Sequence, residues 1–150
     1  MRKVFYLIFI LVWMGVIFCF SNQEADLSTR MSDGFIERTI GSVYKLFDSN
    51  VTIEKLNYIK SKYSYSVRKM AHFTIYLILG LFVFNFIKEY SIRNIILLSV
   101  VICFLYACSD EIHQSFVIGR SCEFKDVLID TTGSFIGIML FNIIYSLRKK

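Results

Sequence analysis

Ionisable and hydrogen-bonding residues gather at a few places in an otherwise apolar chain. In chain order they are Arg68, Lys69, His72 and Tyr76, then Asp110, Glu111, His113 and Gln114, then Arg120, and finally Asp126 and Asp130. Basic side chains bind phosphate or carboxylate groups, and arginine does so bidentately. A histidine oriented by a carboxylate can act as a general base. Oxygen donors from acids can hold a hard divalent cation.

The spacing within each group places its members on one side of a helix, because residues three or four apart share a face. The aligned sets are Arg68 with His72 and Tyr76, Lys69 with His72, Asp110 with His113 and Gln114, and Asp126 with Asp130. The last line continues through Gly133 to Gly137. Small residues four apart allow a neighbouring helix to approach closely, so a tight helix contact is predicted there.

The elements that carry these groups are predicted from composition and hydropathy. Of the 150 residues, 55% are hydrophobic and only 19% charged, and there is no proline. Soluble domains are about 45–50% apolar and about 25% charged, so a soluble, collagen-like or disordered chain is excluded. Four runs approach the roughly 17–25 residues that a membrane span needs. They are Val4–Phe20, Ala71–Ile87, Ile92–Cys108 and Val127–Leu147.

We therefore predict an all-α polytopic membrane protein, with residues 1–150 as a single domain. The first run is longer than the roughly 7–15 apolar residues of a signal peptide, so it is interpreted as a retained span. Between the first two spans, an amphipathic helix is predicted to lie on the bilayer or to cap the bundle. Its apolar residues are Ile36, Ile40, Val43, Tyr44 and Phe47.

Successive spans cross the membrane in opposite directions. The start of the second span, the end of the third and the start of the fourth therefore lie at the same membrane face, and the polar groups should meet there. Basic residues fill the short segments at the other face. They are Arg2, Lys3, Lys88, Arg93, Arg148, Lys149 and Lys150. Positive residues in short loops favour the cytoplasm. Both termini are predicted to be cytoplasmic and the polar groups extracytoplasmic, although Arg68 and Lys69 count against this orientation.

Simpler interpretations exist for each polar residue alone. Asp126 could cap the fourth helix, Arg68 and Lys69 could anchor the interface, and a lone histidine is more often a packing residue. However, cations at the start of the second span and acids at the end of the third stand at the unfavourable poles of their helix dipoles. We expect them to face each other or to share a ligand, which makes a functional cluster the preferred interpretation.

The segments Arg68–Tyr76 and Ser109–Ser121, followed by Asp126, Asp130, Gly133 and Gly137, resemble the VanZ-like family. That family comprises small bacterial membrane proteins of about four spans, whose namesake is tied to low-level resistance to the lipoglycopeptide teicoplanin. The resemblance implies a set of signature polar residues, namely Lys69, His72, Tyr76, Asp110, Glu111, Gln114, Arg120, Asp126 and Asp130. Ile75 and Ile118 depart from it, since relatives often carry an acid and a proline there.

Two functions are predicted for the cluster, with transport as a third and less favoured one. In the first, it binds or shields a membrane lipid, a lipid-linked cell-wall precursor or a lipoglycopeptide. The ligand-binding residues would be Arg68, Lys69, His72, Tyr76, Asp110, Glu111, Gln114, Arg120, Asp126 and Asp130. In the second, it is an interfacial hydrolase or transferase. The catalytic candidates would be His72, Asp110, Glu111 and His113.

Other partners are constrained by the distribution of charge and cysteine. The 17 lysines and arginines are scattered, which argues against nucleic acid. The four cysteines, Cys19, Cys103, Cys108 and Cys122, are interpreted as small apolar residues. No cofactor is predicted and no metal site is assigned, although Asp110, Glu111, His113, Asp126 and Asp130 offer an alternative oxygen-rich cation site. Homo-oligomerisation stays open.

Overall fold

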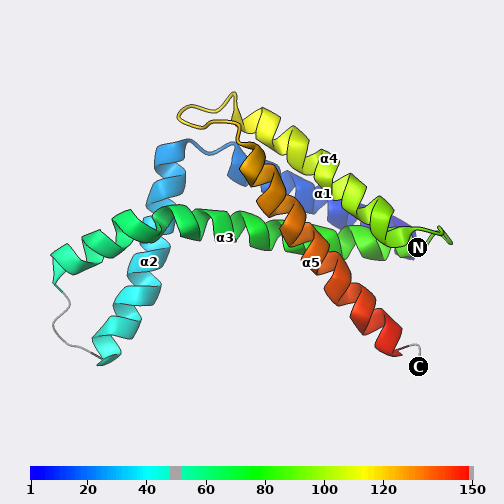
Figure 1. Cartoon of the computed structure of the whole chain (residues 1–150), viewed down its shortest axis with the longest axis horizontal. Coiled ribbons are helices and arrows are strands. Elements are labelled where there is room, and N and C mark those ends of the chain that lie inside the picture. Colours follow the sequence, from blue (N-terminus) through cyan, green and yellow to red (C-terminus); the bar gives the residue numbers. More distant parts are fainter. Residues whose placement is uncertain (48–51, 149–150) are drawn as a thin grey trace.

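The computed structural model describes residues 1–47 and 52–148, without the side chains of residues 40 and 44–47. The described residues form five helices and no strand. In chain order the helices are α1 (Arg2–Ser21), α2 (Ala25–Phe47), α3 (Ile53–Lys88), α4 (Ile95–Gln114) and α5 (Phe124–Arg148). The prediction of an all-α chain is confirmed (Figure 1).

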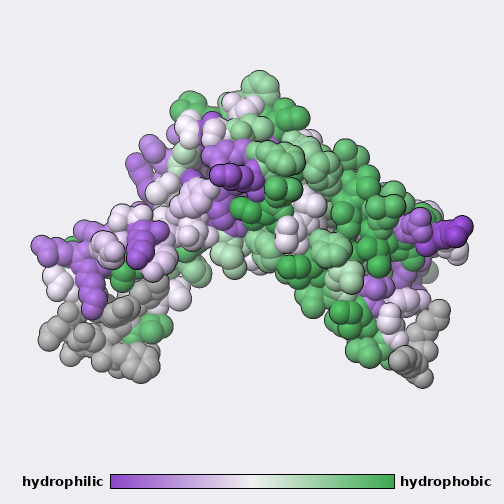
Figure 2. All heavy atoms as spheres, viewed as in Figure 1, coloured by the Kyte–Doolittle hydropathy of each residue, from purple (hydrophilic) through white to green (hydrophobic). Residues whose placement is uncertain are grey.

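Four of these helices, α1, α3, α4 and α5, are long and apolar enough to cross a membrane. Three of the predicted runs lie wholly within α1, α3 and α5, and α4 contains the fourth run except for its first three residues. Large apolar side chains such as Leu11, Leu105 and Leu140 are exposed on their outer faces. A soluble bundle would bury such side chains, whereas lipid solvates them. Figure 2 shows the resulting apolar surface over the part of the molecule that holds these helices. The chain is a polytopic membrane protein.

Two of the predicted span boundaries differ from the helix boundaries. α3 begins at Ile53, far ahead of the predicted start at Ala71. The segment before Ala71 and the predicted span form one uninterrupted helix. α4 begins at Ile95 instead of Ile92 and continues past Cys108 to Gln114. Hydropathy marks the thickness of the hydrocarbon layer, whereas a helix continues as long as its backbone hydrogen bonds do. The polar residues next to the apolar runs therefore belong to the helices.

The molecule has the outline of an arch (Figure 1). One arm is the four-helix bundle of α1, α4, α5 and the C-terminal half of α3. The other arm, which we call the hairpin arm, consists of α2 and residues 53–67 of α3, and it is largely hydrophilic in Figure 2. The α4–α5 loop lies where the two arms meet.

The amphipathic helix predicted after the first span is confirmed, and the structure places it along α3. In the hairpin arm, Ile36 is fully buried, and Glu37 forms an ion pair with Lys60 at 2.6 Å. The start of α2 meets the α4–α5 loop, where the Ala25 N–H donates to the Ile118 carbonyl at 3.4 Å. It therefore lies beside the extension of α3 and does not cap the bundle along its length. The predicted side chains of Ile40, Tyr44 and Phe47 lie outside the described part of the structure.

Glycines bring α3 and α5 into direct backbone contact, as the small-residue pattern predicts. A Cβ at Gly133 would overlap the carbonyl oxygen of Phe73, and one at Gly137 would overlap that of Leu77. Gly80 of α3 makes the reciprocal approach to the backbone of α5. This close packing fixes α5, and with it Asp126 and Asp130, against the face of α3 that carries the basic residues.

The bundle has two distinct ends. At one end Lys3 lies over the ring of Tyr90 at 4.1 Å, and Lys88 lies over the ring of Tyr145 at 4.2 Å. Both chain termini lie towards this end, away from the α4–α5 loop (Figure 1). The predicted parity of the spans is confirmed, because the basic short segments are at one end and the polar groups are at the other. Which end faces the cytoplasm stays a prediction.

Candidate functional site

A pocket of about 80 Å³ lies at the end of the bundle, beneath the α4–α5 loop. It is lined by Ala25, Tyr65, Arg68, Lys69, His72, Gln114, Gly119, Arg120, Ser121, Glu123, Asp126, Ile129 and Asp130. Seven of the ten predicted ligand-binding residues are in this lining. The other three, Tyr76, Asp110 and Glu111, are buried and do not line it. The structure thus brings residues from α3, α4, α5 and the α4–α5 loop to one place.

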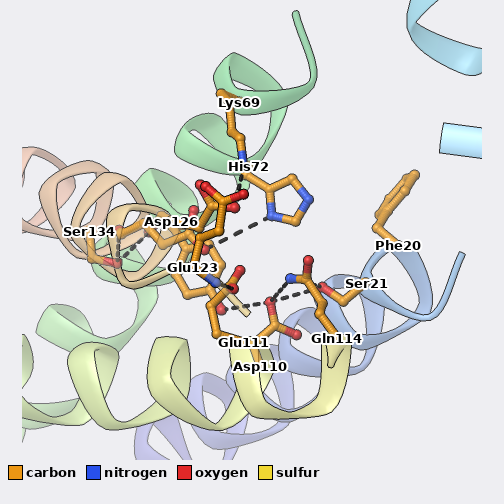
Figure 3. Close-up of polar contacts among 12 residues, drawn as sticks. Phe20, Ser21, Lys69, His72, Asp110, Glu111, Gln114, Glu123, Asp126 and Ser134 are labelled. Carbon is orange, nitrogen blue, oxygen red and sulfur yellow. Dashed lines mark hydrogen bonds and ion pairs between the residues drawn. The ribbon is translucent and has the colours of Figure 1, made fainter. Parts of the chain in front are cut away.

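Asp110 is the centre of a buried hydrogen-bond network beside the pocket. Its Oδ2 accepts from Ser21 Oγ at 2.8 Å, from Tyr76 Oη at 3.1 Å and from Gln114 Nε2 at 3.3 Å. Figure 3 shows Ser21, Asp110 and Gln114 pointing towards one another. The network joins α1, α3 and α4. Three donors to one carboxylate oxygen stabilise its charged form inside the bundle and fix its position.

Arg120 is held by neutral acceptors. Its Nη1 donates to Gln114 Oε1 at 2.8 Å, and its Nη2 donates to the Phe20 carbonyl at 3.5 Å. Burial lowers the pKa of Arg120, and the nearby charge of Arg68 acts in the same direction. Because an arginine side chain starts from so high a pKa, it stays charged at physiological pH. Arg120 therefore brings a positive charge to the pocket.

A tight turn aims Arg120 into the pocket. The Arg120 N–H donates to the Val117 carbonyl at 3.1 Å, and Gly119 has a φ of 75°. A positive φ at the third residue is typical of a type II turn and favours glycine. The turn forms although Ile118 replaces the proline that is common in relatives. The hydrogen bond that closes the turn therefore does not depend on that proline.

Two acid–base pairs join α3 to α5 at the pocket. Lys69 forms an ion pair with Asp126, and His72 Nδ1 lies 3.9 Å from Asp130 Oδ2 (Figure 3). Asp126 also lies in the first turn of α5, where a negative charge favours the helix dipole. Its predicted roles as a dipole partner and as a member of the cluster are therefore compatible.

The prediction about unfavourable helix poles is wrong for the cations. Because α3 begins at Ile53, Arg68 and Lys69 lie well inside the helix, where the dipole has little effect. Lys69 also pairs with Asp126 of α5 and not with the acids of α4. The dipole argument applies only to the acids at the end of α4, such as Glu111. Its carboxylate is held by the Glu123 backbone N–H, which donates to Oε2 at 3.0 Å.

The two histidines are separated by the fold. His72 lines the pocket, whereas His113 stacks on Phe18 of α1 with ring centroids 4.3 Å apart and does not line it. Of the four catalytic candidates, His72 alone borders the pocket directly, with Asp110 and Glu111 behind its wall. As their spacing predicts, Asp110 and His113 lie on the same side of α4, where both contact α1 through Ser21 and Phe18, respectively.

Several site residues were not predicted from the sequence. Ser21 is fully buried and binds Asp110, but a serine at the end of an apolar run gives no distinctive signal. Tyr65 lines the pocket, and its ring centroid lies 5.6 Å from the Arg68 guanidinium and 5.0 Å from Lys69 Nζ. Tyr65 stands three and four residues before those cations. Extending the helix backwards from Arg68 would have revealed the alignment.

Together these contacts divide the pocket into two halves. The outer half carries Arg68 and Arg120, neither of which has an ion pair with an acid among the described residues. The inner half carries His72 and Asp130 with Asp110 behind its wall, and one donor atom from each of the three lies within 4.8 Å of the others. The outer half is suited to an anion, and the inner half to an amine or a metal cation.

The sequence profile of the VanZ/LLP1 family matches residues 5–145. The chain belongs to the VanZ/LLP1 family. The match confirms the resemblance carried by the polar motifs and extends it through the first span. No curated protein and no solved structure matches the chain. The pocket described above is therefore the site in which the signature polar residues of this VanZ/LLP1 protein come together.

Proposed function

We propose that this VanZ/LLP1 protein binds the anionic headgroup of a lipid-linked envelope component. The observation that carries the proposal is the pair of guanidinium groups, Arg68 and Arg120, in one pocket. Neither has an acidic partner among the described residues, and Arg120 donates only to neutral oxygens. Two nearby positive charges repel each other, and a phosphate between them would relieve that repulsion through bidentate hydrogen bonds.

The size of the pocket limits the part of the ligand that it can enclose. Its volume is about 80 Å³. Sites that enclose drug-sized molecules measure roughly 300–1,000 Å³. The pocket can therefore hold a phosphate or a group of similar size, while the rest of the ligand stays outside. A lipoglycopeptide could insert only a carboxylate or amine, so a lipid phosphate is the preferred ligand.

Apolar side chains near the pocket support an amphiphilic ligand. Phe116 and Ile118 of the α4–α5 loop and Phe124 at the start of α5 are 81%, 75% and 66% exposed, respectively. Large apolar side chains at the end of a membrane bundle are suited to contact lipid chains. A lipid whose phosphate occupies the pocket could place its acyl or prenyl chain against these residues and the outer faces of α3 and α5.

The proposed location of the pocket is the extracytoplasmic face, with both termini in the cytoplasm. The basic residues Lys3, Lys88 and Arg93 stand at the other end of the bundle in short segments, which favours the cytoplasm for that end. At the outer face, binding or shielding a wall precursor would limit the access of a lipoglycopeptide. This is how the protein would contribute to low-level teicoplanin-type resistance without a chemical reaction.

Lipid binding by the full chain in nanodiscs tests the proposal. A fluorescent polyprenyl phosphate is the probe, and Arg68→Ala and Arg120→Ala are the variants. Each removes a charge-assisted hydrogen bond, so affinity should fall about 10- to 100-fold. Arg93→Ala, at the other end of the bundle, is the matched control. Unchanged affinity in both pocket variants, or an equal loss in the control, would refute the proposal.

A susceptibility assay tests the link to resistance. Asp110→Asn, Glu111→Gln and Arg120→Ala should each reduce the teicoplanin tolerance conferred by expression of the protein, because each disturbs the wall or the base of the pocket. Protein levels in the membrane fraction serve as the control. If all three variants are well expressed and leave both susceptibility and lipid binding unchanged, binding or shielding at this site is excluded.

One observation favours a second function, hydrolysis or group transfer on a phosphate-containing lipid or wall precursor. His72 borders the pocket with Asp130 at 3.9 Å, which is the arrangement of a base and its orienting carboxylate. Arg68 and Arg120 would then stabilise developing negative charge. Turnover of a labelled precursor by the purified protein, lost in His72→Ala and retained in His113→Ala, would establish the enzyme. Absence of turnover in the wild-type protein would leave binding as the function.

A further inference from the structure

Three buried acids lie at the inner half of the pocket or behind its wall. Asp110, Glu111 and Asp130 are 3%, 1% and 1% exposed. Lys69 pairs with Asp126, and Arg120 donates to neutral oxygens. No lysine or arginine among the described residues forms an ion pair with any of the three buried acids. Burying carboxylates without an ion pair is costly, so a proton or a positive ligand would stabilise this group.

Asp130 shows where such a ligand would sit. It lines the pocket, it is almost completely buried, and neither of its carboxylate oxygens has a hydrogen-bond partner among the described residues. Asp110 is different, since its Oδ2 accepts three hydrogen bonds while its Oδ1 has no such partner. Unpartnered buried carboxylate oxygens are rare in proteins and call for an explanation. One carboxylate oxygen from each of the two acids lies within 4.8 Å of a ring nitrogen of His72.

We infer that His72, Asp110 and Asp130 form a binding site for a divalent first-row transition-metal cation. One donor atom from each residue lies within 4.8 Å of the other two. Donors to one tetrahedral zinc ion stand about 2.0–2.2 Å from it, and hence about 3.3–3.6 Å from one another. The three donor atoms therefore need to approach one another by at most about 1.5 Å. Two carboxylates and a neutral imidazole balance the charge of a divalent cation.

The donor set selects the kind of cation. Ca²⁺ requires six to eight oxygen ligands and Mg²⁺ prefers oxygen throughout, whereas this site offers three protein ligands, one of them nitrogen. An imidazole combined with carboxylates suits Zn²⁺ or Mn²⁺. The remaining coordination positions would face the pocket, from which His72 and Asp130 can be reached. Ser21, Tyr76 and Gln114 hold Asp110 in place from behind, as the supporting residues of metal sites do.

This inference deepens the proposed function in one respect, since a metal at the base of the pocket would face the phosphate held by Arg68 and Arg120. The metal site itself depends on other residues and can be tested without lipid. The experiment is equilibrium binding of Zn²⁺ and of Mn²⁺ to the purified full chain in a phosphate-free, lipid-free detergent. Metal content is measured after dialysis, and the shift in thermal unfolding is measured in parallel.

We expect one equivalent of metal per chain. His72→Gln, Asp110→Asn and Asp130→Asn should each weaken binding by more than about 100-fold, because loss of even a supporting residue commonly costs 10- to 100-fold. His113→Gln is the matched control and should bind like the wild type. Arg68→Ala should also retain the metal, so failure of the lipid proposal would not be mistaken for failure of the metal site.

Folding of the variants does not obscure the result. Asp130→Asn removes an unbalanced buried charge at almost constant volume, so in metal-free buffer it should unfold at the same temperature as the wild type or higher. Its unfolding temperature should no longer respond to metal. The inference is overturned if the wild-type chain binds neither metal below about 1 mM, a weak affinity for a protein site. It is also overturned if Asp130→Asn and His72→Gln bind as well as His113→Gln does.

Discussion

Replacing Gly137 with alanine should separate α5 from α3 and destabilise the bundle. A Cβ at this position would overlap the Leu77 carbonyl oxygen and would lie 3.0 Å from the Leu77 carbonyl carbon and 3.3 Å from its Cα. These are backbone atoms of a helix, so no side-chain rotation can make room. α5 would have to move outwards along the contact that places Asp130 beside His72.

The size of the effect follows from comparison with a glycine that has free space. Gly15 of α1 has no other atom within 4 Å of an added Cβ. Both substitutions gain the same intrinsic helix preference of alanine, at most about 1 kcal/mol. Only Gly137→Ala overpacks a helix contact, and overpacking costs about 1–3 kcal/mol of stability. The free energy of unfolding of Gly137→Ala should therefore be lower than that of Gly15→Ala by about 1–3 kcal/mol. This difference corresponds to an unfolding equilibrium constant that is about 5- to 150-fold larger.

Reversible unfolding in mixed detergent micelles, followed by far-ultraviolet circular dichroism, measures this difference. Gly133→Ala should behave in the same way, because its Cβ would overlap the Phe73 carbonyl oxygen. The double variant should cost less than the two single variants together, since one displacement of α5 relieves both overlaps. The reasoning is refuted if Gly137→Ala and Gly133→Ala are as stable as Gly15→Ala.

Three further predictions concern the pocket and its orientation. Gly119→Ala places a Cβ at a φ of 75°, which costs about 1–2 kcal/mol and should weaken polyprenyl phosphate binding by misplacing Arg120. In a double-mutant cycle with Lys69→Met and Asp126→Asn, the half-buried ion pair should show a coupling of about 1–3 kcal/mol in unfolding. Cys122 is exposed beside the pocket, so a membrane-impermeant maleimide should label it on intact cells.

Each of these predictions has its own control. Gly34→Ala has open space around the added Cβ and should leave phosphate binding unchanged, so an equal effect of both alanines would contradict the role of the turn. The more exposed pair Lys60–Glu37 should show a coupling below about 1 kcal/mol. A Cys122→Ser variant checks that labelling is specific. Labelling of Cys122 only after permeabilisation would place the pocket in the cytoplasm and reverse the proposed orientation.

Much of the fold could be predicted from the sequence because hydropathy and periodicity are local properties. Each of the four apolar runs corresponds to one of the helices α1, α3, α4 and α5. The line from Asp126 through Asp130 to Gly133 and Gly137 lies on one side of α5, as its spacing of three or four residues requires. The ends of the helices were less predictable. Polar residues such as Tyr65 extend α3 beyond its apolar run without changing its backbone hydrogen bonds.

The candidate site was predictable as a group of residues, but its pairings were not. Spacing alone could not show that Lys69 pairs with Asp126, because the partner lies on another helix whose rotation depends on packing. The same rotation turns His113 towards Phe18 and away from the pocket. Ser21 enters the network because α1 ends beside α4, a contact between residues far apart in the chain.

The sequence by itself determined that this protein is a helical membrane protein and which polar residues come to one end of its bundle. Both properties follow from the order of residues along a single helix or from the alternating direction of successive spans. The tertiary structure alone decided which side chains meet, which acids stay without a cation, and that a pocket with an anionic and a cationic half results. These depend on how far each helix is rotated and how closely α3 and α5 approach, and that is set by contacts between distant parts of the chain.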